Sequence, residues 1–566
     1  MKNRIYSLLI MATLAAIITG CSKESDKEPD PTLSLSPATT AVVFSADGKT
    51  ATSGGTALTP NFTVTTNQTA WDVQVTPAGS WCTATKSGST FTLTAVANPS
   101  ITAPEPATVT VTAGNAQPVT ISVTQFGADA ALAISPVVEA LEFSASGTKV
   151  FIGTQEVAPN FAVTTNQTSW EVTVTPAGSW CRAAKTEDGN GFTLTADINR
   201  ATSAPDQATV TVTADDADPI TITVTQKPAV YDIYLVGMTQ DAGLSGWRNA
   251  EPLFTGTNNP NSKFYPYQMT VSNGKIYTAG QLILRNTYLR NTYAAVYEDG
   301  REKYRLTAGS ASGDDGEAGA IAVLNGDIYT AGYEHKSGSN YYYYNFWKNG
   351  GSGSDGSTVS LTSSTEAASV TDMEISGSRF LLCGSLYDND NDYTQATFFS
   401  SGPDLNFTAI PLAANVYSYA HGMAVRGDDV LIAGEVEESE VRPVLWSVNA
   451  EGVVTESTPA GSANGRFTDI AVEGEDVYLL LIYQDTEYQR WMKVLRNGEE
   501  VPGCTMAAMM TNNPRIAVAG GDIYWVAVGG VDGESSWTYD VYKNGNLAWR
   551  VGNALNYAML EVVMRE

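Results

Sequence analysis

The segment 323–332, VLNGDIYTAG, recurs almost letter for letter at 271–280 as VSNGKIYTAG. In each copy two apolar runs meet at an Asn-Gly dipeptide. This pattern predicts a tight hairpin, because both central residues of such a turn take positive φ. A single hairpin is only marginally stable in water. The sequence therefore predicts that the two hairpins belong to a larger structure built from repeats.

The hairpin recurs in altered form through the C-terminal part of the chain, each time with a glycine before its second strand. These glycines are Gly274, Gly326, Gly377, Gly427, Gly474 and Gly521. Their spacings of 52, 51, 50, 47 and 47 residues match the period of a four-stranded propeller blade. Further short strands around a second tight turn, as in 539–550, are predicted to complete each blade.

The two ends of this region determine the predicted number of blades. Residues 231–237, YDIYLVG, match the second strand of the hairpin but lack the first strand. Residues 559–565 match the missing strand, so the last strand is predicted to complete the first sheet and leave no open edge. We therefore predict a seven-bladed β-propeller over residues 228–566, with six blades as the alternative count.

The connections of this propeller are predicted to differ between its two ends. Turns within the hairpins lie at one end and are short, whereas connections between hairpins lie at the other end and are long and rich in Tyr, Asn, Asp and Arg. Function is commonly carried on such loops, and aromatic rings with polar tips suit contact with sugars or proteins. The candidate ligand-binding residues are Tyr341, Tyr343, Tyr387, Tyr393, Tyr483, Tyr488 and Trp491.

The N-terminal half contains a different repeat, about one hundred residues long. Residues 61–82 and 160–181 agree at 18 of 22 positions, and the motifs ATVTVTA and VTQ also recur. Short alternating strands over this length predict a β-sandwich. Two tandem immunoglobulin-like β-sandwiches are therefore expected, at 33–127 and 128–227.

Each of these repeats resembles the BACON domain of Bacteroidota proteins. The resemblance rests on a first tryptophan in an alternating strand (Trp71, Trp170), a second ten residues later (Trp81, Trp180), and the closing T-V-T-Q. It implies modules that bind glycan or mucin, or spacers that hold a neighbouring domain away from the membrane. The residues themselves favour core packing for the four tryptophans, because they lie among alternating apolar residues.

The N-terminus predicts export and anchoring. Residues 1–20 have a basic start and an apolar stretch too short to span a membrane, as in signal peptides. The stretch ends in ITGC, which resembles a bacterial lipobox and implies acylation of Cys21; an ordinary signal peptide is the alternative. Residues 21–32 predict a flexible tether, and its charged start resembles a Bacteroidota surface-export signal. The expected location is the outer membrane, lipid-anchored and facing the exterior.

Composition limits the chemistry that can be expected. The 566 residues carry a formal net charge of −28, which argues against nucleic-acid partners. With two histidines and five cysteines, no metal site, cofactor site or catalytic residue set is predicted. Residues 388–392, DNDND, resemble half of a calcium loop but lack the Gly and Glu that follow, so a solvated acidic loop is preferred.

The combined prediction is an all-β surface lipoprotein with no catalytic activity. Its sandwiches form a stalk, and its propeller binds a glycan or a mucin-like host glycoprotein. The alternatives are a propeller glycoside hydrolase or lyase with unrecognised catalytic carboxylates, and a structural protein-docking scaffold. An outer-membrane glycan transporter is a partner that only the family resemblance implies.

Overall fold

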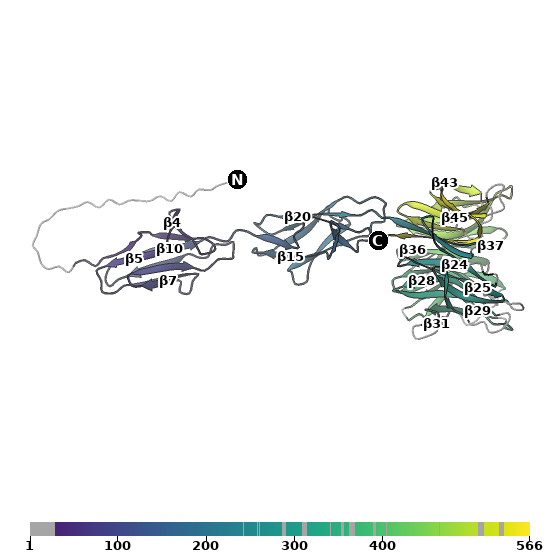
Figure 1. Cartoon of the computed structure of the whole chain (residues 1–566), viewed down its shortest axis with the longest axis horizontal. Coiled ribbons are helices and arrows are strands. Elements are labelled where there is room, and N and C mark those ends of the chain that lie inside the picture. The colour runs from purple at the N-terminus through teal and green to yellow at the C-terminus, as the bar shows by residue number, and fades with distance from the viewer. Residues whose placement is uncertain are drawn as a thin grey trace, which may run out of the picture. The chain divides into compact units, whose positions relative to one another are not determined.

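The structure is a computed structural model of the chain. It describes residues 29–240, 243–256, 259, 261–285, 290–307, 314–339, 341–351, 356–361, 368–388, 392–402, 404–462, 464–507, 514–530 and 537–565. Within these residues the chain forms 48 strands and no helix, which confirms the predicted all-β class (Figure 1). Accordingly, the described part of the chain has no helix long and apolar enough to span a membrane.

The first ten strands form two sheets, in the orders β1-β5-β8-β7 and β4-β3-β2-β10-β9-β6. Their bounds are β1 (Leu33–Ser36), β2 (Ala41–Phe44), β3 (Ala51–Ser53), β4 (Thr56–Leu58), β5 (Asn61–Thr66), β6 (Asp72–Thr76), β7 (Cys82–Ser87), β8 (Thr90–Ala95), β9 (Ala107–Thr112) and β10 (Val119–Gln125). Strands β10 and β2 pair in parallel, whereas the neighbours of β9 are antiparallel.

The next ten strands repeat this topology, as the sequence repeat predicts. The orders are β11-β15-β18-β17 and β14-β13-β12-β20-β19-β16. The bounds are β11 (Leu132–Ser135), β12 (Ala140–Phe143), β13 (Val150–Ile152), β14 (Gln155–Val157), β15 (Asn160–Thr165), β16 (Glu171–Thr175), β17 (Cys181–Lys185), β18 (Gly191–Ala196), β19 (Ala208–Thr213) and β20 (Ile220–Gln226).

The repeated tryptophans are used for packing. Trp71 and Trp81 pack against the apolar core of the first pair of sheets, and Trp170 is buried in the second. The indole of Trp81 donates to the carbonyl of Glu105 at 3.0 Å, so its polar edge is also satisfied. Trp180 is partly buried. The placements of Trp71, Trp81 and Trp170 match the expected core packing.

The glutamine that closes each repeat holds three chain segments together. The Gln125 amide donates to the carbonyls of Ser45, Ala46 and Val96 at 2.9–3.2 Å. Gln226 makes the equivalent contacts in the second repeat. A buried amide that satisfies several carbonyls gives a physical reason for the recurring VTQ motif.

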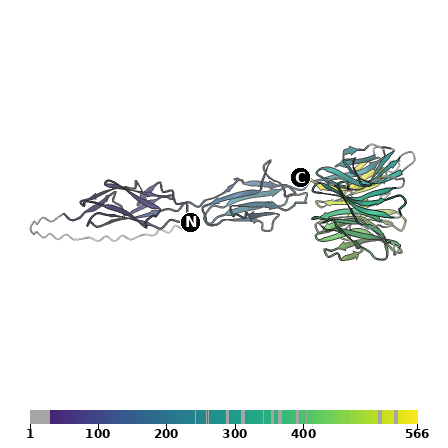
Figure 2. The ribbon, with the colours of Figure 1, turned by 90° about the horizontal axis from the view of Figure 1, so that it is seen from below.

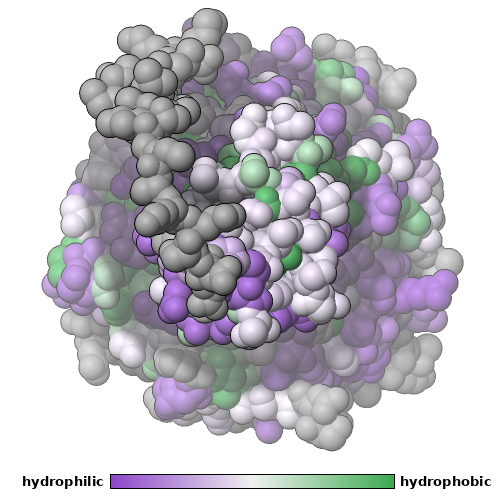
Figure 3. Space-filling view, turned by 90° about the vertical axis from the view of Figure 1, so that its left-hand side faces the viewer, coloured by the Kyte–Doolittle hydropathy of each residue, from purple (hydrophilic) through white to green (hydrophobic). Residues whose placement is uncertain are grey.

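Outside these cores, strand positions that face water carry mainly Thr and Ser, as in β5 and β9. Figure 3 shows one face of the molecule, coloured by hydropathy. Its surface is mostly white and purple, with scattered green patches. No large hydrophobic area is visible on the part of that face that the grey atoms leave uncovered.

Strands β21–β48 form seven four-stranded antiparallel sheets (Figures 1 and 2). The innermost strands are β24 (Ser262–Ser272), β28 (Asp315–Leu324), β32 (Ala368–Ser376), β36 (Tyr417–Arg426), β40 (Gly465–Glu473), β44 (Arg515–Ala519) and β48 (Ala554–Met564). Each contacts the next, and β48 contacts β24, so the described inner strands close a circle. The C-terminal part is therefore propeller-like.

The second strands are β21 (Tyr231–Thr239), β25 (Lys275–Arg285), β29 (Asp327–His335), β33 (Arg379–Asp388), β37 (Asp429–Glu437), β41 (Asp476–Gln484) and β45 (Asp522–Gly530). The third strands are β22 (Gly243–Arg248), β26 (Arg290–Glu298), β30 (Tyr342–Lys348), β34 (Tyr393–Ser401), β38 (Val441–Val448), β42 (Arg490–Arg496) and β46 (Trp537–Lys543). The outer strands are β23 (Glu251–Thr255), β27 (Arg301–Arg305), β31 (Ser357–Ser360), β35 (Phe407–Pro411), β39 (Val454–Ser457), β43 (Glu499–Ala507) and β47 (Asn546–Val551).

The last strand completes the first sheet of the ring. Strand β48 pairs antiparallel with β21, so that Tyr231 lies opposite Met564 and Leu235 opposite Leu560. The predicted pairing of 231–237 with the C-terminus is therefore confirmed. Because the chain enters the ring at Tyr231, it enters at the end that carries the tight hairpin turns.

The Asn-Gly turns have the predicted geometry. Asn325 and Gly326 have φ of 53° and 86°, and Leu324 pairs directly with Asp327 across the turn. Asn273 and Gly274 behave in the same way. Two successive residues with positive φ are characteristic of type I′ hairpin turns, whose twist suits the flanking strands.

A recurring set of side-chain contacts explains why an Asp-Ile-Tyr motif at the start of a second strand is accompanied by a Lys-Asn-Gly motif at the turn that follows the third strand. In the third sheet the amide of Asn349 donates to Asp327 at 2.7 Å and accepts from the Ile328 N–H at 2.9 Å, while Lys348 forms an ion pair with Asp327. These contacts hold the pKa of Asp327 below its usual range. The same contacts recur at Asp476 and Asp522. Each set of contacts joins the start of a second strand to the turn between the third and outer strands.

Candidate functional site

The predicted aromatic residues lie on three different sheets, the third, fourth and sixth. On the third sheet, the tyrosines at 341–344 alternate as expected for an extended segment. Tyr341 and Tyr343 are 46% and 38% exposed, whereas Tyr344 is buried and Tyr342 packs against His335 with ring centroids 4.6 Å apart. Two of the four rings are thus available to a ligand.

The fourth sheet presents less aromatic surface to a ligand than the third sheet does. Tyr393 is only 8% exposed, and its hydroxyl accepts a hydrogen bond from the Asn415 N–H at 3.0 Å. Its ring therefore presents little surface for stacking, which argues against its inclusion among the candidate ligand-binding residues. Tyr387 donates to the carboxylate of Asp392. The calcium alternative at 388–392 falls largely on residues 389–391, which lie outside the described residues, as does Cys21.

The sixth sheet places two predicted residues, Tyr483 and Tyr488, in one groove of about 730 Å³ at the loop end of the ring. The groove runs between the fifth and sixth sheets. The other residues that line it are Glu435, Glu440, Val441, Asn464, Gly465, Arg466, Ile482, Gln484, Asp485, Thr486 and Arg490. Tyr488 is 79% exposed, the most exposed aromatic ring among the predicted candidates in the described residues.

Asp485 shapes the loop that presents Tyr488. Its carboxylate accepts from the Trp491 indole at 2.7 Å and from the N–H groups of Glu487 and Gln489 at 2.9 Å. These contacts hold the pKa of Asp485 below its usual range, the Trp491 hydrogen bond being the largest cause. Trp491 does not line the groove; its indole instead binds the carboxylate that orders this loop, while Tyr488, with a φ of 62°, projects into solvent.

Charged groups of both signs border the groove. Glu435 is buried and lies 3.1 Å from the Nε2 atom of His421, which belongs to the inner strand β36. Glu440 accepts from the Asn464 amide. Arg490 is exposed, and Arg466 is partly buried. A wall of aromatic, amide, carboxylate and guanidinium groups can contact both the C–H faces and the hydroxyls of a sugar.

A second site, which the sequence did not predict, lies at the centre of the ring. A cavity of about 330 Å³ is lined by polar residues of the inner strands, among them Gln268, Asp372, Glu374, Asp469, Arg515 and Glu561. Gln268, Asp372, Asp469 and Arg515 share one position of their inner strands, which Ala320 and Gly422 occupy in two others. Glu374 and Glu561 share a second position, which is alanine in four other inner strands. That contrast between repeats was the signal available in the sequence.

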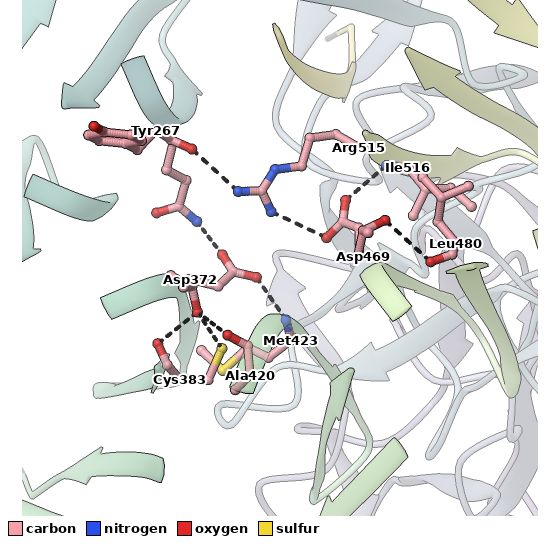
Figure 4. A network of polar contacts seen from close by, with 12 residues as sticks. Tyr267, Asp372, Cys383, Ala420, Met423, Asp469, Leu480, Arg515 and Ile516 are labelled. Atoms are coloured by element: carbon pink, nitrogen blue, oxygen red, sulfur yellow. Dashed lines mark hydrogen bonds and ion pairs between the residues drawn. The ribbon is translucent and has the colours of Figure 1, made fainter. Parts of the chain in front are cut away.

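Three of these side chains link neighbouring sheets. The carboxylate of Asp372 accepts from the Met423 N–H of the next inner strand at 2.8 Å, and Asp469 accepts from Ile516 N–H at 2.8 Å (Figure 4). Gln268 likewise accepts from Ile321 N–H at 2.6 Å and donates to Asp372. The inner strands are therefore joined by side-chain-to-backbone bonds where they meet.

Arg515 is the cation of this network. Its guanidinium lies 3.4 Å from Asp469 and donates to the carbonyl of Tyr267 at 3.3 Å (Figure 4). Gly422 permits the approach of Asp469, since a Cβ at that glycine would lie 2.6 Å from the carboxylate oxygen. Burial raises the pKa of Asp469 to about 6, and Arg515 opposes the rise.

The remaining cavity carboxyls lack such a partner. Burial raises the pKa values of Glu374 and Glu561 to about 8, and in Glu374 the neighbouring Asp372 adds to the rise. Nearer the loop end, burial and Asp315 raise the pKa of Glu317 to about 7, against a hydrogen bond from Tyr267. Among the described residues, no three His, Cys, Asp or Glu side chains are placed to hold a metal ion.

These shifts predict that the ring loses stability as pH rises. A carboxyl with a raised folded-state pKa contributes stability that is fully present below the unfolded pKa, near 4.5, and lost as pH rises through the folded pKa, here about 8. We expect the thermal midpoint to fall between pH 6 and pH 9 in phosphate and borate buffers. Glu561→Gln should remove part of that slope and stabilise the chain at pH 9 by about 1–3 kcal/mol. If the thermal midpoint of Glu561→Gln fell with pH as steeply as that of the parent chain, the raised pKa of Glu561 would be contradicted.

No protein-family model matches the chain, and no curated protein matches it. Similar solved structures include a quinonprotein alcohol dehydrogenase-like protein from Bacteroides thetaiotaomicron, 8% identical over 78% of this chain and 99% of that chain, with a TM-score of 0.33. Trypanosoma rangeli sialidase with the inhibitor DANA is 8% identical over 52% and 56%, with a TM-score of 0.32. The titin domains z1z2 with telethonin are 14% identical over 35% and 95%, with a TM-score of 0.23. Likeness at these scores carries no inference about what this chain binds.

Proposed function

We propose that this protein is a cell-surface lipoprotein that binds a glycan or a mucin-like glycoprotein without catalysis. In this proposal its architecture is two immunoglobulin-like β-sandwiches followed by a seven-bladed β-propeller, with the sandwiches as stalk and the propeller as binding tip. The observation that carries the binding role is the groove beside Tyr488, because it combines an exposed ring, fixed by its loop, with carboxylate and guanidinium groups. An aromatic ring whose loop is already ordered loses little conformational freedom on binding, which suits it to contact a ligand.

The placement of the groove supports this role. It lies at the end of the ring opposite the tight turns, and the chain enters the ring at the tight-turn end. No covalent connection to the N-terminal repeats therefore crosses the loop end. A glycan array probed with residues 22–566 tests the proposal directly. Binding to no glycan and to no mucin would refute it.

A prediction for the groove follows. Tyr488→Ala should weaken binding of the best array ligand by about 2 kcal/mol, close to thirtyfold, because the ring is the main stacking surface. Tyr488→Phe keeps the ring and should bind nearly as well as the parent chain. Tyr343→Ala removes an exposed ring from another sheet, although a less accessible one (38% exposed against 79% for Tyr488), and serves as the control. If calorimetry shows the loss for Tyr343→Ala but not for Tyr488→Ala, the site lies on the third sheet.

Anchoring is proposed to occur through acylation of Cys21, which would place the protein on the outer membrane, facing the exterior. An outer-membrane glycan transporter is the partner this location suggests. Cys21→Ala should leave the protein without lipid, because the thiol is the acceptor for the first acyl chain. Radiolabelled palmitate should enter the parent protein and not the variant. Equal labelling of both would show that Cys21 is not the site.

One observation favours an enzymatic alternative, a glycoside hydrolase or lyase. Glu317 has a pKa raised to about 7 and accepts from Tyr267, near a second carboxylate on the same face of β28, Asp315. A carboxyl poised near neutrality beside another is a common arrangement for acid–base chemistry. Incubating array-positive glycans with the parent chain and with Glu317→Gln separates the two functions. Products formed by the parent alone would favour the enzyme.

A further inference from the structure

The groove beside Tyr488 contains an exposed cation that no other described side chain engages. Arg490 begins the third strand of the sixth sheet, β42, and lines the groove. Its side chain makes no hydrogen bond, ion pair or ring contact with the described residues. Other arginines of this part of the chain are paired, as Arg442 is with Glu456. In a chain with 60 acidic and 32 basic residues, an unpaired guanidinium in a groove indicates a contact for a ligand.

The three carboxyl groups of the groove, by contrast, already have hydrogen-bonding partners. Glu435 lies 3.1 Å from the Nε2 atom of an inner-strand histidine. Glu440 accepts from an asparagine amide, and Asp485 accepts from an indole and from two backbone N–H groups. None of the three forms an ion pair with Arg490. The positive charge of Arg490 is therefore not neutralised from within the groove.

The ordered loop that carries Tyr488 also positions Arg490. Gln484 and Arg490 pair across the base of this loop, and the amide of Gln484 donates to the Tyr488 carbonyl at 2.9 Å. The Tyr488 N–H donates to the carbonyl of Asp485 at 3.1 Å, which closes a turn within the loop. Residues two apart in a chain have Cα atoms at most about 7 Å apart. One sugar residue can therefore stack on the ring while a substituent on that sugar reaches the guanidinium.

The chemical group that best complements an unpaired guanidinium is an oxyanion. The planar guanidinium presents parallel N–H donors that match two oxygens of a carboxylate or of a sulfate ester. A second guanidinium, that of Arg466, lines the same groove from β40. The net charge of −28 opposes an approaching anion, but salt at physiological strength largely screens this repulsion beyond about 8 Å. Direct contact inside the groove is screened much less.

We infer that the groove beside Tyr488 recognises an acidic sugar, whose carboxylate or sulfate is bound by Arg490 while Tyr488 stacks on its C–H face. This inference rests on the proposed function and narrows the ligand from glycans in general to anionic glycans. Arg490 determines the preference for acidic over neutral sugars, whereas Tyr488 contributes to the binding of both. The effects of the two side chains can therefore be separated by experiment.

The test is a glycan array on which each oligosaccharide core is present in neutral, sialylated and sulfated form, probed with residues 22–566. Sialyllactose, sulfated lactose and lactose form one such set, and calorimetry in 150 mM sodium chloride gives their affinities. We expect an acidic form to bind at least about tenfold more tightly than the neutral form of the same core, as charge-assisted hydrogen bonds predict. The acidic form that binds more tightly identifies carboxylate or sulfate as the group that is recognised.

Substitutions at Arg490 test the assignment of this preference. Arg490→Gln should lower the affinity for the acidic form at least about tenfold and that for the neutral form much less. Arg490→Lys keeps the charge but loses the parallel donors, so it should fall between the parent and Arg490→Gln. Tyr488→Ala should weaken binding of both forms. Arg301→Gln is the matched control, because Arg301 is an exposed arginine on β27, outside the groove, and it should bind as the parent does.

Circular dichroism establishes that each variant remains folded. The inference is overturned if acidic and neutral forms of a core bind equally, or if Arg490→Gln keeps the preference of the parent chain. Either result still includes binding to a glycan, so the proposed function stands. Undiminished binding to mucin from which the glycans have been removed would show that an acidic peptide is recognised, and would also overturn the inference. Binding to no glycan and to no mucin would refute the proposed function and this inference together.

Discussion

Removing residues 554–566 is expected to abolish cooperative folding of the ring or to lower its thermal midpoint by at least ~10 °C. The deletion removes β48, so β21 loses its antiparallel partner along Tyr231–Gly237 and both edges become unpaired. It also exposes the cluster in which Leu560 and Ala558 pack against Val526 and Tyr539. The expected loss is on the order of 5 kcal/mol or more.

A synthetic peptide of residues 552–566 provides the control for this deletion. If the defect is the missing strand, added peptide should raise the midpoint of the truncated chain in a concentration-dependent manner, because binding to the folded state stabilises it by mass action. Arg565→Ala, which removes only the ion pair with Asp232, should cost far less. A truncated chain that melts within a few degrees of the parent would show that the ring does not depend on this closure.

Several features of the fold could be predicted because they are local. Asn325 and Gly326 specify a turn whose geometry depends on two residues alone, and repetition of that turn indicates the number of sheets. The closure could also be predicted, since the sequence at 231–237 lacks a strand that the C-terminus supplies. Such inferences need only the pattern of one chain, without knowledge of which residues meet across the ring.

The central network could not be predicted in the same way, for a physical reason. Five inner strands contain a register shift at equivalent places, for example between Val370 and Asp372 and between Phe467 and Asp469. A bulge inserts one residue and changes which side chains face the centre beyond it. Simple alternation therefore assigns Asp372 and Asp469 no definite face. The exposure of individual aromatic side chains could not be predicted from the sequence either. Tyr393 and Tyr488 look alike in sequence, yet Tyr393 is buried and Tyr488 is exposed.

Asp469→Ala is expected to be the most damaging single substitution in the network, at about 3–5 kcal/mol. Asp469 accepts from Ile516 N–H and faces the guanidinium of Arg515. Alanine would leave that N–H without its acceptor and a largely buried cation without its nearest carboxylate. Both losses occur at the junction of β40 and β44, where the two inner strands meet.

A double-mutant cycle with Arg515→Met separates the two contributions, measured as free energies of unfolding in denaturant at pH 7. If the unpaired cation dominates, Asp469→Ala combined with Arg515→Met should be more stable than Asp469→Ala alone, because no buried charge remains uncompensated. If the loss of the Ile516 hydrogen bond dominates, the double variant should be no more stable than the single one. Asp469→Asn keeps an acceptor for Ile516 but removes the charge, so it should fall between the parent and alanine. A cost below about 1 kcal/mol for Asp469→Ala would mean that the sheets are held by apolar packing alone.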